Sequence, residues 1–485
     1  MRTVRFQFRT IVVLSFLASM TGGHLDAVLA DSKANVSVEQ QHEKSVKQKK
    51  KKQTVCRLFF QDDETKTVKW ADIISGETLQ MGTPSVIEGF PRLDAEKQNL
   101  VQMESSLGTI LMGVRDHAGG ENQSGWILLD SGVKEESHGN HTHWYYKKNP
   151  QVIASKLDAR QGNPAHLYLY QGVYYLANDR NSGYTRLDPQ TFRNQPSQEI
   201  KTGFHRGGGN HITLAVVEGK TGYSSWIDGE GSQKGLIDVT RILPEGNKEI
   251  AYSFTLPAGA IHGVTTCAGK VFFAPADGIC WCKADLNPLP QNQSNVKVHH
   301  LTLGKDEETK KPNRTGAFST HRNYVLFVSG KGDAARLCLL NAKSEQPALI
   351  SVPLNMREGN APAALEVTRT AWGKRLAFVF HNHPQEQEQE QDEYLSIIDL
   401  DPDANLDFQD AKLLKQIKVG PSKVEGHYGH HAISFDNAGR YAFWTEPGAG
   451  KIRTLSLETL EPGSSFTVSG VPAKLIVMGQ QDGRD

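Results

Sequence analysis

The stretch GKVFFAPADGICWCKAD (269–285) decides the fold. It holds two short apolar runs separated by a turn rich in Gly, Asp and Pro. Two strand-like runs joined by turn residues predict a β-hairpin. The same layout recurs along the chain, in GVYYLANDRNSGYTRLD (172–188), GYSSWIDGEGSQKGLIDV (222–239), NYVLFVSGKGDAARLCLLN (323–341) and GRYAFWTEPGAGKIRTLSL (439–457). Segments 106–130 and 374–401 repeat it with longer turns.

A further strand-like run precedes most of these hairpins and another follows. Four antiparallel strands repeated every ~40–50 residues are typical of a β-propeller. Seven such units extend from about residue 99 to 470. The flanks can supply an eighth, with middle strands from 56–73 and an inner strand from 473–478. We therefore expect an all-β fold, a single propeller of eight four-stranded blades, with seven blades as the alternative.

The two ends of the chain differ from this repeated region. Arg2, Arg5 and Arg9 precede the apolar run IVVLSFLASM, and small residues follow at 28–30. This pattern predicts a secretory signal peptide over 1–30, cleaved after Ala30. Residues 31–54 are polar and Lys-rich and are expected to form a disordered linker before a propeller domain at 55–480. The mature protein is expected to be exported, to the periplasm in a Gram-negative cell, with no membrane insertion.

Charge and cysteine content limit the possible partners and crosslinks. Lys+Arg and Asp+Glu both count 54, so no net field recruits nucleic acid. Five cysteines in an exported chain permit disulfides. The repeat pattern places Cys267 and Cys280 on neighbouring strands, so either Cys280 or Cys282 could bridge to Cys267. A soft-metal site at the Cys-x-Cys pair is the alternative.

Histidines recur where inner strands are expected to begin. The inner strands of all blades line the central channel, so residues near their starts converge on one axis. His166, His211 and His262 have this position in three repeats, and His430 and His431 have it in a fourth. A single histidine at a strand start is usually structural, but the recurrence favours a shared metal.

Acidic residues recur at the turn after the second strand of several repeats: Asp116, Asp179, Asp228, Asp277 and Glu446. Propeller topology places this turn on the same face as the start of the inner strand. Imidazole and carboxylate together suit Zn²⁺, which takes about four ligands. We therefore expect a zinc site whose candidate ligands include Asp228 and Asp277, although acidic residues are also common turn formers.

The stretch ESHGNHTHW (136–144) adds His138, His141 and His143 within six positions. It is either a metal-capturing arm or an ordinary polar loop. Strand counting places it on the face opposite the other histidines, so it must fold back or form a separate site. His205 is a weaker candidate. We expect solvent exposure for two other pairs, His299 and His300 on an outer strand and His381 and His383 on the polar insert.

Several of these blocks resemble the AztD-type periplasmic zinc metallochaperones. The resemblance covers roughly residues 56 to 310 and rests on DSGVKEESHGNHTHW, GNPAHLYLYQGVYYLA, NHITLAVV and AIHGVTTCAGKVFFAPADGI. It implies a propeller that hands Zn²⁺ to the solute-binding protein of an ABC importer. It matches His138, His141 and His143 to the flexible loop of that family, and His166, His211 and His262 to its channel histidines.

The chain also departs from the pattern of that family. Val264 stands where a carboxylate is expected, and the cysteine upstream of that block is missing, with Cys267 after it instead. The main hypothesis is a monomeric zinc chaperone that is not an enzyme, because no nucleophile motif or acid–base pair is found. The alternatives are a metal-dependent propeller hydrolase, similar to a lactonase, and a protein-binding scaffold.

Overall fold

A computed structural model describes residues 52–117, 123–139, 142–194, 202–383, 392–423 and 430–481. The predicted signal peptide, its cleavage site and nearly all of the predicted linker lie outside these residues, as does His141. Within the described part of the chain, no helix has the length and apolar character needed to span a lipid bilayer.

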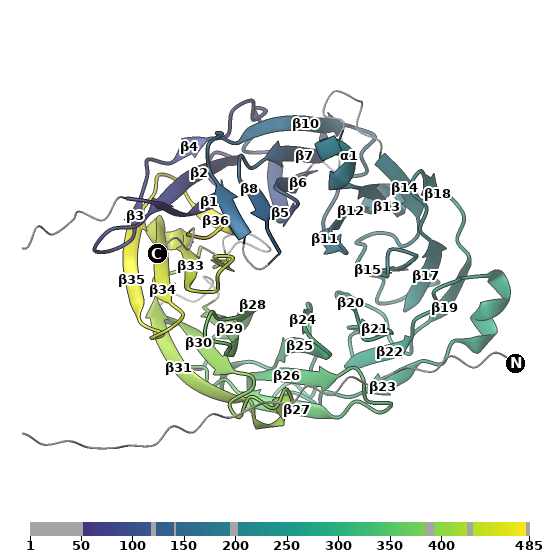
Figure 1. Ribbon diagram of the computed structural model, residues 1–485. Helices are drawn as coiled ribbons and strands as arrows, with labels where there is room; N and C mark the ends of the chain where they lie inside the picture. The colour runs from purple at the N-terminus through teal and green to yellow at the C-terminus, as the bar shows by residue number, and fades with distance from the viewer. Residues whose placement is uncertain are drawn as a thin grey trace, which may run out of the picture. The chain divides into compact units, whose positions relative to one another are not determined.

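The described strands form a ring of eight antiparallel blades around a central channel (Figure 1). This confirms the all-β propeller and the eight-blade prediction. From the inner to the outer strand, blade 1 consists of β5 (Gln98–Ser106), β6 (Thr109–Asp116), β7 (Ser124–Asp130) and β10 (Gln151–Asp158). Blade 2 consists of β11 (Leu167–Tyr170), β12 (Val173–Asn178), β13 (Gly183–Leu187) and β14 (Thr202–Arg206), and blade 3 of β15 (Leu214–Val217), β16 (Thr221–Ser225), β17 (Leu236–Arg241) and β19 (Tyr252–Thr255). Blade 4 consists of β20 (Val264–Cys267), β21 (Lys270–Phe273), β22 (Ile279–Lys283) and β23 (His299–Leu301).

Blades 5 to 7 follow the same order, and β18 (Gly246–Asn247) adds to the outer edge of blade 2. Blade 5 consists of β24 (Ser319–His321), β25 (Tyr324–Ser329), β26 (Arg336–Asn341) and β27 (Leu349–Pro353). Blade 6 consists of β28 (Ala361–Arg369), β29 (Arg375–Asn382), β30 (Glu393–Asp399) and β31 (Lys412–Val419). Blade 7 consists of β32 (Ile433–Phe435), β33 (Tyr441–Glu446), β34 (Lys451–Ser456) and β35 (Pro462–Thr467).

Blade 8 joins the two ends of the propeller. Its inner strand β36 (Pro472–Met478) pairs antiparallel with β1 (Thr54–Asp62), with Phe59 opposite Ile476. The sheet continues through β2 (Thr67–Ile74) to β3 (Gln80–Met81) and β4 (Ser85–Val86). This arrangement closes the ring without leaving an unpaired inner edge. Figure 1 shows β36 beside β1.

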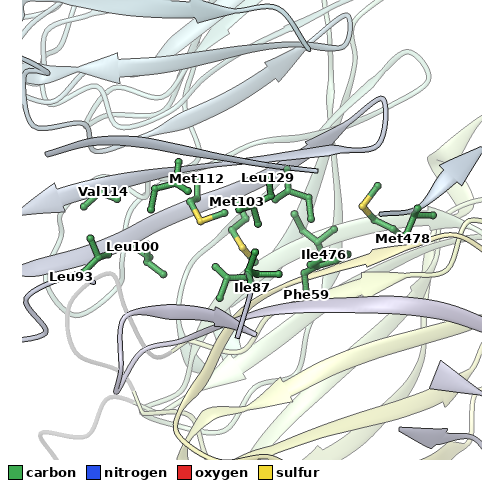
Figure 2. Packing of buried hydrophobic residues seen from close by; sticks show 14 residues of the cluster. Phe59, Ile87, Leu93, Leu100, Met103, Met112, Val114, Leu129, Ile476 and Met478 are labelled. Carbon is green, nitrogen blue, oxygen red and sulfur yellow. The ribbon is translucent and has the colours of Figure 1, made fainter. Parts of the chain in front are cut away.

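The hydrophobic core is divided into clusters that lie between neighbouring blades. One cluster packs Phe59 and Ile476 of blade 8 against Met103 and Met112 of blade 1 (Figure 2). Another packs Phe443 of blade 7 against the inner strands of blade 8. Burying each large apolar side chain contributes roughly 1.5–3 kcal/mol, so these interfaces hold the ring together.

Few helical segments interrupt the blades. They are α1 (Pro189–Asn194) and the 3₁₀ turns η1 (Asp179–Asn181), η2 (Pro290–Asn295), η3 (Gly332–Ala334), η4 (Phe408–Asp410) and η5 (Pro447–Ala449). A separate hairpin, β8 (Lys134–Ser137) and β9 (Thr142–Tyr145), projects from the connection between β7 and β10. The described residues of the predicted loop at 136–144 therefore belong to a hairpin.

The bridge that Cys280 or Cys282 could make to Cys267 is not formed, since all five cysteines are free and buried. The assignment of Cys267 and Cys280 to neighbouring strands was wrong, because β21 lies between them. Two strand spacings of ~4.8 Å exceed the ~7 Å limit that a disulfide sets on its Cα atoms. The thiols of Cys280 and Cys282 lie in an apolar cluster, where burial raises the pKa of each to about 12.

Candidate metal centre

Three histidines from three different blades meet at one end of the channel. His166, His211 and His262 immediately precede or lie close to the first residues of the inner strands β11, β15 and β20. One ring nitrogen from each lies within 4.8 Å of the others, and the Nε2 atoms of His166 and His211 are 2.8 Å apart. Nitrogen ligands of a tetrahedral zinc with bonds of ~2.0–2.1 Å lie about 3.3 Å apart, so small side-chain shifts would fit the ion.

The turn before β15 explains why the sequence GGGN precedes His211. Gly208 has a φ of +73° and Asn210 a φ of +65°, in the left-handed region that favours Gly and Asn. A Cβ atom on Gly209 would collide with the ring of Trp226. The glycines therefore allow a tight turn against Trp226 that directs His211 toward the channel.

The other two histidines are held by backbone contacts. The backbone oxygen of His166 accepts a hydrogen bond from the Ala177 amide at 2.8 Å. The Nδ1 atom of His262 lies 3.2 Å from the carbonyl oxygen of Gly316, which suits an Nδ1–H donor and leaves Nε2 for a metal. Burial lowers the pKa of His262, and this favours the neutral imidazole that metal binding requires.

Asp179 contacts His211 on the side of the ring away from His166. Its Oδ2 atom lies 3.5 Å from Nδ1 of His211 and accepts a hydrogen bond from Nη1 of Arg115 at 3.0 Å. Its Oδ1 atom accepts one from the Ile212 amide at 3.0 Å. A carboxylate in this position orients an imidazole so that the opposite nitrogen faces the metal.

The sequence reasoning included Asp179 only as a possible ligand and missed Arg115. The block VRD ends β6, and the block AND ends β12 at Asn178 with Asp179 directly after it; that parallel was the available signal. What the pattern did not reveal is that Arg115 of one blade reaches Asp179 of the next.

His430 and His431 diverge although they are adjacent. His430 lines the same cavity as His166 and His211, and its Nδ1 atom lies 3.1 Å from Nδ2 of Asn382. His431 points into the protein, where it stacks on Phe380 and its Nε2 lies 2.9 Å from the Gly420 oxygen. Burial lowers the pKa of His431 to about 4. His431 therefore has a structural role.

The two acidic candidates lie outside the three-histidine cluster. Asp228 accepts a hydrogen bond from Nδ2 of Asn210 at 2.8 Å, and its backbone oxygen accepts one from Ala260 at 3.1 Å. It thus links the turns that carry His211 and His262. The Oδ1 atom of Asp277 lies 3.3 Å from Nε2 of His300 on the outer strand.

The expectation of solvent exposure was wrong for the histidines near the polar insert. His381 and His383 are 1% and 6% exposed, because β29 extends to Asn382 before the insert begins. His381 bonds to Oγ of Ser396 at 2.8 Å. His205 is also fully buried, stacked on Tyr184, while His299 and His300 do lie on the outer strand β23.

The hairpin histidines lie at the other end of the channel. The connection from β7 to β10 leaves blade 1 at the end where β5 finishes, whereas the three-histidine cluster surrounds the strand starts. The same connection contacts the end of β36, where the Tyr146 hydroxyl donates to the Gln480 oxygen at 2.9 Å. The rings of His138 and His143 are 5.2 Å apart, while His141 lies outside the described residues. The hairpin therefore forms a group separate from the cluster.

A cavity of about 380 Å³ adjoins the three-histidine cluster. Its wall includes His166, His211 and His430 together with the charged side chains Arg115 and Lys474. The cluster is thus reached from a hollow in the channel mouth, where ligands can approach it.

Comparison with known proteins supports the fold only. No family profile matches this sequence, and no curated protein matches it at the sequence level. Two solved structures of AztD from Citrobacter koseri, one of them the apo form, superpose with a TM-score of 0.60 at 15% identity. Each comparison covers 89% of this chain and 100% of the AztD chain. The chain therefore shares the overall propeller architecture of AztD.

Proposed function

We propose that this protein binds Zn²⁺ at His166, His211 and His262 and passes the ion to an acceptor protein. The observation that supports this most strongly is the convergence of three imidazole nitrogens from three blades within 4.8 Å. Residues separated by about 45 to 50 positions in sequence meet there only because the propeller brings their strands to one axis. Imidazole is a preferred ligand of Zn²⁺.

The geometry favours binding that is both tight and reversible. All three histidines stand at rigid inner strands, so little conformational entropy is lost when the ion binds. The adjoining cavity gives an incoming ligand access to the ion. We propose that the acceptor is the solute-binding protein of a zinc importer, that the protein acts after export, and that it catalyses no reaction.

Zinc titration of the purified, untagged protein tests the proposal. Competition with a chromophoric chelator should reveal one tight site in the wild type. The triple variant His166→Ala, His211→Ala and His262→Ala should lose that site while its far-UV circular dichroism stays unchanged. Variant His300→Gln, on the outer strand, is the matched control and should retain it. An unchanged tight site in the triple variant would rule the cluster out.

Transfer is measured separately. Zinc-loaded protein is mixed with a candidate zinc-binding importer subunit. The two proteins are then separated, and the zinc content of each is measured. Faster transfer than to a small chelator of equal affinity supports direct delivery. Equal rates would mean simple dissociation, which leaves a zinc reservoir as the function. Turnover of ester or lactone substrates by the zinc-loaded protein would instead indicate a hydrolase.

A further inference from the structure

The cavity beside the cluster has the features of a small-molecule site. Its volume of about 380 Å³ lies within the ~300–1,000 Å³ that is usual for ligand pockets. Leu100, Val101 and Ala165 supply apolar wall, and the side chains of Gln61 and Gln102 supply amide groups. Such a mixture of apolar surface and a few polar groups favours a small organic ligand over a bare ion.

Arg115 is one of two cationic side chains in the cavity wall. Its Nη1 atom donates to Oδ2 of Asp179 at 3.0 Å and to the Asn163 oxygen at 3.3 Å. Both bonds come from Nη1, so they hold one end of the guanidinium, and the side chain remains 31% exposed. Arg115 also lines a second, outer cleft of about 740 Å³, together with Arg180. A guanidinium held at one end can still present donors to a carboxylate.

Lys474 is the other cation, and it comes from the inner strand of blade 8. Among the described residues, no carboxylate makes an ion-pair contact with it. Glu104 on β5 and Glu366 on β28 act on it electrostatically, although Glu366 remains open to channel water. Enclosure by the channel walls raises the pKa of Glu104 to about 8 and that of Glu366 to about 7. Burial lowers the pKa of Lys474, and the charges of Glu366 and Glu104 act in the opposite direction.

The remaining acidic group in the cavity wall is already paired. Asp63 accepts a salt bridge from Lys66 at 2.7 Å. Asp179, behind Arg115, is occupied by Arg115 and the Ile212 amide. Among the described residues of the cavity wall, Lys474 is thus the cation that has no ion pair. Arg115 is paired with Asp179 through Nη1 alone, so its other guanidinium nitrogens can still donate, and a metal ion at the cluster would add positive charge.

We propose that this cavity binds a small organic carboxylate beside the metal, with Arg115 and Lys474 as its anion-binding groups. The expected effect of the metal on carboxylate binding rests on the proposed zinc-binding function. The two cations come from different blades, so a dicarboxylate suits them better than acetate. Metal and carboxylate should strengthen each other's binding by the same factor, because linkage between two sites is reciprocal.

Glutarate is the probe, because it carries two carboxylates and chelates zinc weakly in solution. Isothermal titration is run on the full-length protein, metal-free and loaded with one equivalent of Zn²⁺. We expect saturable binding that is roughly tenfold tighter with zinc, within the usual range of such coupling. Glutaramide, the neutral analogue, should not bind. Sulfate at matched ionic strength distinguishes a carboxylate site from general attraction of anions.

Three variants locate the site. Lys474→Met and Arg115→Lys should each weaken glutarate binding roughly tenfold, as expected for one charge-assisted hydrogen bond. Arg115→Lys keeps a positive charge near Asp179 and loses the planar fork. Arg180→Ala, in the outer cleft, is the control and should bind like the wild type. Circular dichroism and metal-free unfolding show whether each variant is folded.

The outcomes separate this inference from the proposed function. Zinc binding without saturable glutarate binding would overturn the carboxylate site and leave zinc binding intact. Equal displacement of glutarate by sulfate would also overturn it. If the wild type binds no zinc, the proposed function fails, and the metal-free titration decides the cavity. Millimolar glutarate binding that Lys474→Met abolishes would then support the site, and its absence would refute it.

Discussion

The Oδ2 atom of Asp179 lies 3.5 Å from Nδ1 of His211, while Nε2 of His211 lies 2.8 Å from Nε2 of His166. The ring of His211 therefore stands between a carboxylate and the metal-binding cluster. This arrangement favours the tautomer that carries its proton on Nδ1 and presents the Nε2 lone pair to an ion.

Replacing Asp179 should weaken zinc binding without removing a ligand. We expect Asp179→Asn to lower affinity by about 10- to 100-fold, the usual effect of losing such a partner. The amide keeps the shape of the side chain and loses the charge that faces His211. Asp277→Asn, whose carboxylate pairs with His300 at 3.3 Å, should leave affinity within about twofold. Equal affinities of wild type and Asp179→Asn in chelator competition would contradict the positioning role.

The fold was predictable because its signals are local and repeated. The hairpin in 269–285 shows two short apolar runs around turn formers, and its recurrence identifies a propeller. The eighth blade followed from joining 56–73 to 473–478, which the pairing of Phe59 with Ile476 confirms. The expectation that strand-start histidines approach one another also followed from topology alone, and the structure places three of them together.

The remaining details depend on side-chain direction and on where strands end, which a pattern does not reveal. His430 and His431 are adjacent in sequence, yet one lines the cavity and the other is buried against Phe380. The polar sequence that follows His381 suggested that this residue is exposed, but β29 continues to Asn382 and buries it. The contact between Arg115 and Asp179 joins two blades, and sequence spacing carries no information about such contacts.

Buried neutral histidines should make stability fall on acidification. Burial lowers the pKa of His381 to about 4, against ~6.5 in an unfolded chain. The unfolded state therefore binds more protons below pH ~6.5, so this contribution is complete above that pH and is lost as the pH falls toward ~4. In His381→Gln, which can still bond Ser396, the free energy of unfolding should fall less steeply, by up to about 1.4 kcal/mol per pH unit.

Urea titration of metal-free protein between pH ~7 and ~4.5 measures this difference. Glu104 and Glu366, whose pKa values are raised, titrate with the opposite sign. They are present in both proteins, so their effect cancels when the two are compared. His300→Gln serves as the surface control. Parallel pH dependences of wild type and His381→Gln would refute the assignment.

Among single residues of blade 8, we expect that replacing Arg57 reduces the stability of the fold the most. It is 1% exposed, and its guanidinium pairs with Asp72 at 2.7 Å. It also donates to the backbone oxygens of Ser131, Tyr146 and Lys148, at both ends of the hairpin segment. Arg57→Met would leave these acceptors unsatisfied, and we expect a loss of about 3–5 kcal/mol in urea unfolding.

A surface pair provides the comparison. Nζ of Lys220 lies 2.9 Å from Oε2 of Glu218, and both side chains are more than half exposed. Lys220→Met should therefore change stability by less than about 0.5 kcal/mol. A similar small loss for Arg57→Met would mean that water replaces its hydrogen bonds and that the hairpin base is held by other contacts.

The last prediction concerns the hairpin that carries His138 and His143. It leaves blade 1 at the end of the channel opposite the three-histidine cluster, and Arg57 anchors its base there. From this position we do not expect it to reach an ion at the cluster within one molecule. Replacing residues 136–144 with a short Gly-Ser linker should leave zinc affinity at the cluster, and the rate of zinc release to a small chelator, unchanged.

Delivery to an acceptor protein is the measurement that the deletion should affect. If the hairpin collects zinc or contacts the acceptor, stopped-flow transfer should slow while release to a chelator stays constant. A protein with His138→Gln and His143→Gln separates the two roles, because it keeps the hairpin backbone but loses two of its imidazoles. Slow transfer only in the deletion indicates docking, whereas slow transfer in both indicates metal capture. Unchanged transfer in both would show that ESHGNHTHW has no part in delivery.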